Sequence, residues 1–123
     1  PPPGTRLQAS ADRLMNRQAI AAALNTVRDV RGTARRPTVL RPGAAWPQWA
    51  GAERGSAFTF LRTWRVYVVL PADEAAADLW ADEHIDALAA ALEPVIFVSE
   101  VAPILLNTPE GDMFALMLTG RAE

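Results

Sequence analysis

The sequence contains no cysteine and no lysine, and His84 is its single histidine. Without cysteine there are no disulfides, no thiolate nucleophile and no zinc–thiolate site. One histidine cannot form a histidine-based metal cluster within a chain, and no serine lies in a Gly-x-Ser-x-Gly motif. The common catalytic constellations are therefore missing, and we predict a protein that is not an enzyme and uses no metal or cofactor.

Long apolar runs are also missing. A run such as Val66 to Leu70 is far shorter than the roughly 20 residues that span a bilayer. The N-terminus, Pro1-Pro2-Pro3-Gly4, has neither the charged nor the apolar part of a signal peptide. We therefore expect a protein with no membrane partner.

The chain is long enough for one domain but not for two. Residues 1–9 are rich in proline and show no period, which favours a mobile arm. Met15 opens a run that would make a natural translation start. We predict a flexible N-terminal extension over residues 1–14 and a single α+β domain over residues 15–123.

Charge is divided unevenly along the chain. Residues 1–65 hold 11 arginines and three acidic residues, whereas residues 66–123 hold one arginine and 11 acidic residues. The two halves either neutralise each other within one copy or present opposite charges to neighbouring copies. Both readings stay open at this point.

Periodicity predicts two helices and four strands. A helix is expected over residues 10–30 and a second over 73–92, where Asp73 can cap the N-terminus and Pro94 follows the end. Strands are expected over residues 38–41, 57–70, 95–107 and 113–120, with an irregular segment over 42–56 and a turn over 108–112. The predicted fold is α+β: a four-stranded, mainly antiparallel sheet with two helices on one face, in the order α-β-β-α-β-β.

The predicted strands are apolar on both faces, so the face without helices needs a cover. We favour a neighbouring subunit over the loop that carries the two tryptophans. Arginine suits carboxylates across an interface, although the arginine cluster is also compatible with nucleic acid or with simple solvation. The candidate subunit-interface residues are Arg28, Arg31, Arg35, Arg36, Arg41, Trp46, Trp49 and Leu79.

Three aspartates, Asp78, Asp82 and Asp86, follow one side of the second predicted helix at four-residue spacing. Like charges at this spacing destabilise a helix by about 0.2–0.5 kcal/mol per pair. The default interpretation is a solvated helix face that helps solubility. The alternatives are that the aspartates meet arginines of another copy or line a passage.

The order of elements, with Arg36-Pro37-Thr38-Val39-Leu40-Arg41-Pro42, Trp64-Arg65-Val66-Tyr67-Val68-Val69-Leu70-Pro71 and Ile85-Asp86-Ala87-Leu88-Ala89-Ala90-Ala91-Leu92, resembles the tail-terminator (tail-completion) family of siphophages, especially those of actinobacteria. The resemblance implies a ring, usually of six subunits. Such a ring caps the major tail tube protein, stops its polymerisation and joins the tail to the head-completion or neck connector proteins.

The same resemblance implies a place in the virion at the tail–neck junction, and in the host cytoplasm during assembly. Genome DNA would pass through the lumen without specific binding. An acidic lumen fits Asp78, Asp82 and Asp86 as lining residues. The alternatives are another neck component, such as a head-closure or connector subunit, or an arginine-rich regulator that binds nucleic acid.

Overall fold

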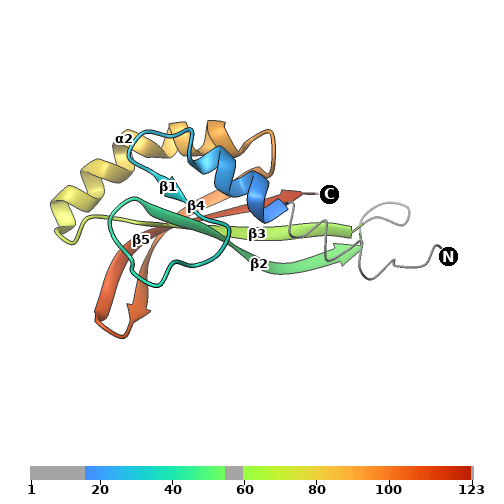
Figure 1. Ribbon diagram of the computed structural model, residues 1–123. Helices are drawn as coiled ribbons and strands as arrows, with labels where there is room; N and C mark the ends of the chain where they lie inside the picture. Colours follow the sequence, from blue (N-terminus) through green and yellow to red (C-terminus); the bar gives the residue numbers. More distant parts are fainter. Residues whose placement is uncertain (1–15, 55–59, 123) are drawn as a thin grey trace.

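The computed structural model describes residues 16–54 and 60–122. A first helix covers residues 16–24 of this part (Figure 1). The remaining elements are β1 (Arg31–Gly32), β2 (Ala44–Arg54), β3 (Phe60–Val69), α2 (Glu74–Leu92), β4 (Phe97–Thr108) and β5 (Gly111–Ala122). The predicted extension over residues 1–14 lies outside the described residues.

The five strands form one mixed sheet in the order β1-β2-β3-β5-β4. Strands β1 and β2 pair in parallel, and the other neighbours are antiparallel. The predicted four-stranded sheet and its α-β-β-α-β-β order are therefore wrong. Along the chain, two strands, β1 and β2, come between the first helix and β3. They pair with each other in parallel.

The error lies in residues 31–54. The predicted strand over 38–41 is irregular backbone, and the segment predicted as irregular contains β2. A proline within this strand, Pro47, cannot donate to a ladder. However, β1 pairs only with Ala44 and Ala45. Pro47 lies beyond that contact, where β2 is an edge strand and the missing N–H costs little.

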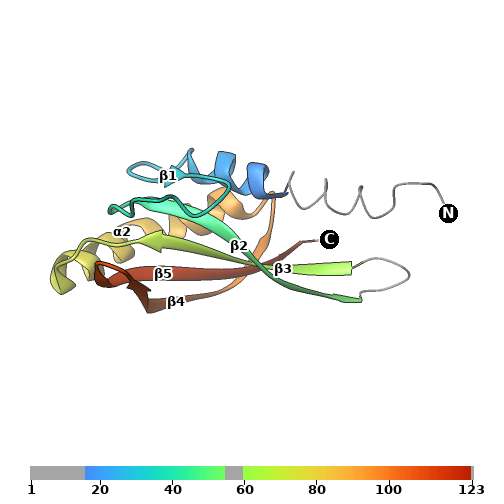
Figure 2. The same cartoon turned by 60° about the horizontal axis from the view of Figure 1, so that its bottom comes forward.

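Both helices cover the same face of the sheet (Figures 1 and 2). Alternation along β3 sends Val66 and Val68 toward this face, where both are fully buried. Leu24 of the first helix and Leu88 of α2 belong to the same apolar cluster. The core therefore lies between the helices and β3 and β5.

The first helix ends earlier than predicted, at residue 24 instead of 30. A turn follows, in which Asp29 adopts a left-handed backbone with φ 66°. Asn25 then bonds Gly32 in both directions, through its amide nitrogen to the carbonyl and from the Gly32 N–H to its side-chain oxygen. This turn redirects the chain into β1.

Helix α2 agrees with its prediction. The Asp73 side chain accepts a hydrogen bond from the Ala76 N–H at 3.0 Å, as expected for an N-cap. Ala77, His84, Leu88 and Leu92 are its buried residues. They recur at four- and seven-residue spacing, which places them on the face of the helix that meets the sheet.

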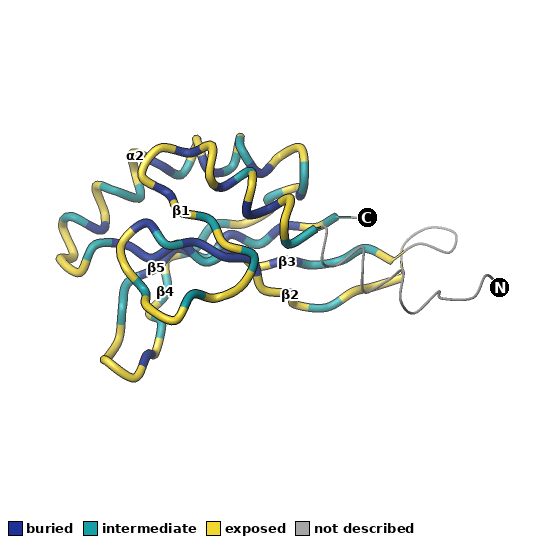
Figure 3. The backbone as a smooth tube through the Cα atoms, in the orientation of Figure 1, coloured by how far each residue is buried: buried dark blue, intermediate teal, exposed yellow. Residues whose placement is uncertain are grey.

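The face opposite the helices is covered only in part. Trp46, Val69 and Ala115 are buried there, outside the main core cluster, beside the segment of residues 33–43. Tyr67 and Met117 are only half-buried. Figure 3 shows the buried stretches concentrated in the middle of the sheet, while the tip of the β4–β5 hairpin is mostly exposed.

Candidate functional site

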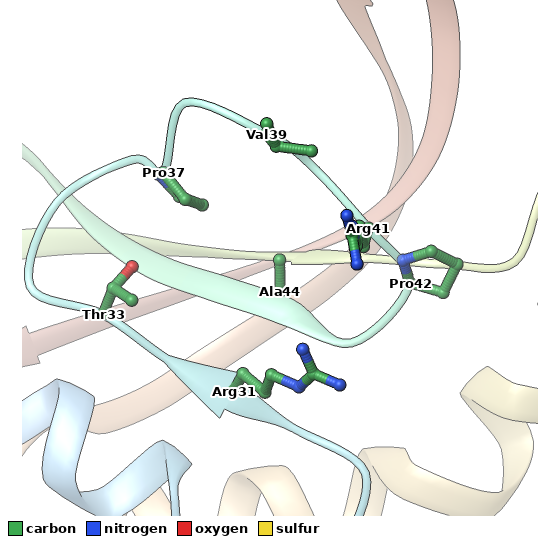
Figure 4. Close-up of a pocket in the computed structure, with 7 residues that line it drawn as sticks. All are labelled: Arg31, Thr33, Pro37, Val39, Arg41, Pro42 and Ala44. Carbon is green, nitrogen blue, oxygen red and sulfur yellow. The ribbon is translucent and has the colours of Figure 1, made fainter.

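The predicted arginine cluster forms a basic surface along the turn before β1 and the segment that joins β1 to β2. All five of its residues are exposed: Arg28, Arg31, Arg35, Arg36 and Arg41. Two of them, Arg31 and Arg41, line one pocket of about 260 Å³ (Figure 4). The rest of its wall is Thr33, Pro37, Val39, Pro42 and Ala44.

Backbone hydrogen bonds hold this pocket in shape. The Arg31 N–H donates to the Gly43 carbonyl at 2.8 Å, and the Thr33 N–H donates to the Ala45 carbonyl at 2.9 Å. The Gly43 N–H donates to the Val69 carbonyl of β3 at 2.8 Å. Since Gly43 has φ 92°, glycine is favoured at this crossing point.

The two arginines of the pocket have unpaired charge. Within residues 16–54 and 60–122, neither guanidinium makes a hydrogen bond or an ion pair with a side chain or carbonyl. Figure 4 shows both side chains on the side of the pocket where Pro42 lies. Two guanidinium groups beside apolar side chains suit a ligand that joins carboxylates to an apolar part.

Arg36 has a different role from its neighbours in the basic surface. Its guanidinium lies over the Trp46 ring, 5.6 Å from the centroid. Trp46 is only 2% exposed and packs against Tyr67 at 5.7 Å between ring centroids. Within one copy Trp46 is thus an interior residue, and Arg36 covers it on the sheet face opposite the helices.

The other apolar candidates are exposed. Trp49 on β2 is 38% exposed and Leu79 on α2 is 59% exposed. The sequence reasoning missed several more exposed side chains, because alternation reveals two faces of a strand but not which one lacks a cover. These are Val39, Phe60, Phe97 and Leu105.

The three aspartates form an acidic surface on α2. Asp78, Asp82 and Asp86 are all exposed, and none of them makes an ion pair with a described residue. The ion pair found in the described part of the chain joins Asp29 to His84 instead. The acidic surface and the basic surface therefore do not neutralise each other through direct contacts within one copy.

Among residues 16–54 and 60–122, no group of three or more His, Asp or Glu side chains is arranged to hold a metal ion. No helix in this part of the chain combines the length and apolar character needed to cross a membrane.

No protein-family model matches the sequence, and no curated protein matches it either. The resemblance to tail terminators therefore stays a prediction that rests on the order of elements and on the residues quoted for it.

Proposed function

We propose that this protein is a structural subunit of a long-tailed bacteriophage. Copies of it form a ring that caps the tail tube, stops its polymerisation and joins the tail to the neck. The observation that carries the proposal is the pair of charged surfaces that remain unpaired within one copy: the arginines of the basic surface and the aspartates of α2.

An unpaired basic surface attracts acidic side chains of a neighbouring copy and orients the encounter. A contact between two different patches of the same chain is heterologous. It repeats from copy to copy and gives a closed ring when the rotation closes. A subunit built in this way needs no catalytic residues.

Exposed apolar side chains add the area that such contacts bury. Phe97 is 70% exposed and Leu105 is 59% exposed, both on β4. Burial of apolar surface stabilises an assembly by about 25 cal/mol per Å². Aromatic residues and arginine are also enriched at the centres of protein interfaces.

The acidic surface suits the inside of a ring that DNA crosses. Asp78, Asp82 and Asp86 lie on the exposed side of α2. Phosphates are repelled by carboxylates, so DNA passes without adhering. The arginines then lie at subunit contacts rather than in the lumen.

Electron microscopy of virions, with this protein located by density or antibody, tests the proposal. We expect a ring at the head-proximal end of the tail tube, and tails of uncontrolled length when the gene is deleted. A ring that touches only head or connector proteins would instead identify another neck component. Absence of the protein from virions, together with salt-sensitive binding of short DNA, would overturn the proposal in favour of a nucleic-acid-binding regulator.

A further inference from the structure

The β4–β5 hairpin extends beyond the rest of the sheet. The last strand contact of β3 joins Val69 to Ala115, and the Leu70 N–H then donates to the Phe114 carbonyl at 2.9 Å. Past this point β4 and β5 pair only with each other, as far as Thr108 and Gly111. In Figure 1 this tip projects downward, away from the helices.

The tip is an acidic turn closed by a hydrogen bond. The Thr108 hydroxyl donates to the Gly111 carbonyl at 2.5 Å, and Thr108 is only 7% exposed. Glu110 and Asp112 are exposed, and neither makes an ion pair with a described residue. A preorganised turn loses little conformational entropy when it binds, so this tip is well suited to insertion.

The pocket lined by Arg31 and Arg41 has the complementary chemistry. It offers two unpaired guanidinium groups and an apolar wall that includes Pro37 and Val39. The hairpin tip offers two carboxylates, and the apolar Leu105 lies on β4 next to it. The aspartates of α2 match the pocket less well, because they lie along the side of a 19-residue helix rather than on a projecting turn.

We infer that the hairpin tip of one copy inserts into the Arg31–Arg41 pocket of a second copy, with Glu110 and Asp112 facing the two guanidinium groups. The inference rests on the proposed ring and names its contact. The pocket belongs to the β1–β2 edge of the sheet and the hairpin includes the opposite edge strand, β4. Each copy therefore gives a tip on one side and receives one on the other, which is the head-to-tail arrangement of a ring.

Charge reversal with mixing tests this contact. The full-length protein is compared with R31E/R41E and with E110R/D112R by mass photometry at low salt. We expect the wild-type protein to form a higher-mass oligomer. In each variant we expect the amount of this oligomer to fall at least tenfold, because like charges then face each other. A 1:1 mixture of the two variants restores the oligomer, because each acidic pocket meets a basic tip and each basic pocket meets an acidic tip.

The matched control is R65E/R121E, which reverses two charges at exposed arginines outside the basic surface and leaves the assembly intact. Circular dichroism confirms that every variant is folded. Unchanged mass in both reversal variants would overturn the contact while leaving the ring in place. A mixture that stays monomeric, or a wild-type protein that is monomeric under all salt conditions, would overturn it too. The proposed function is tested separately, by the location of the protein in virions.

Discussion

The carboxylate of Asp29 lies 3.4 Å from Nε2 of His84, and this contact joins the turn before β1 to helix α2. The His84 ring is also stacked on Trp80, at 3.8 Å between ring centroids, and its Nδ1 lies 2.7 Å from the Trp80 carbonyl oxygen. The Trp80 carbonyl oxygen only accepts a hydrogen bond, so Nδ1 donates to it. The basic surface begins at this turn, and α2 carries the acidic surface.

Replacing His84 tests how much this junction stabilises the fold. His84 is only 9% exposed, so H84A removes a packed ring and leaves a void beside Trp80. We expect the free energy of unfolding to fall by about 2 kcal/mol in urea titration. The neighbouring E83A, at an exposed position, changes it by no more than about 0.5 kcal/mol. Equal effects of the two substitutions would contradict the packing role.

The shape of the pocket depends on Gly43, which joins β1 to β3 through its backbone. A side chain there would collide with the Asp29 carbonyl oxygen, and the backbone has φ 92°. Left-handed strain alone costs an alanine about 1–2 kcal/mol. We expect G43A to lower the free energy of unfolding by more than this, because the collision adds to the strain. G111A is the matched control, because Gly111 has φ 119° with open space around it. A G43A effect no larger than that of G111A would show that the pocket tolerates the side chain.

The two tryptophans of β2 are predicted to behave differently. Trp46 is 2% exposed beneath Arg36, whereas Trp49 is 38% exposed. We expect W46A to destabilise the isolated chain by about 3–5 kcal/mol, as for other buried aromatic residues, and W49A by clearly less. Chemical denaturation followed by circular dichroism measures both. A larger loss for W49A would reverse the assignment of Trp46 as the interior residue.

Asp82 has an acidic neighbour four residues away on each side, Asp78 and Asp86. D82A removes both repulsions and introduces the best helix former, so we expect stability to rise by up to about 1 kcal/mol. The gain shrinks in high salt, where exposed charges are screened. D73A serves as the contrast, because it removes the cap on the Ala76 N–H and should cost about 1 kcal/mol. Thermal melts of both variants at low and high salt decide the matter.

Local patterning was sufficient for the second half of the chain. The apolar spacing of α2 with Asp73 before it, the continuous apolar run in β3 and the turn between β4 and β5 all act within about 20 residues of each other. Such signals are carried by short-range geometry, namely the 3.6-residue and two-residue periods. The observed bounds of α2, Glu74–Leu92, differ from the predicted 73–92 by one residue at the start.

Residues 31–54 could not be read in this way, because their conformation depends on contacts between residues far apart in the sequence. Two residues, Arg31 and Gly32, become a strand only because Ala44 and Ala45 lie parallel to them. Pro47 is accepted in β2 only because the adjoining sheet edge is open. The charges of Arg31 and Arg41 were visible in the sequence. Their meeting around one pocket follows from Gly43, whose carbonyl accepts from Arg31 of β1 and whose N–H donates to Val69 of β3.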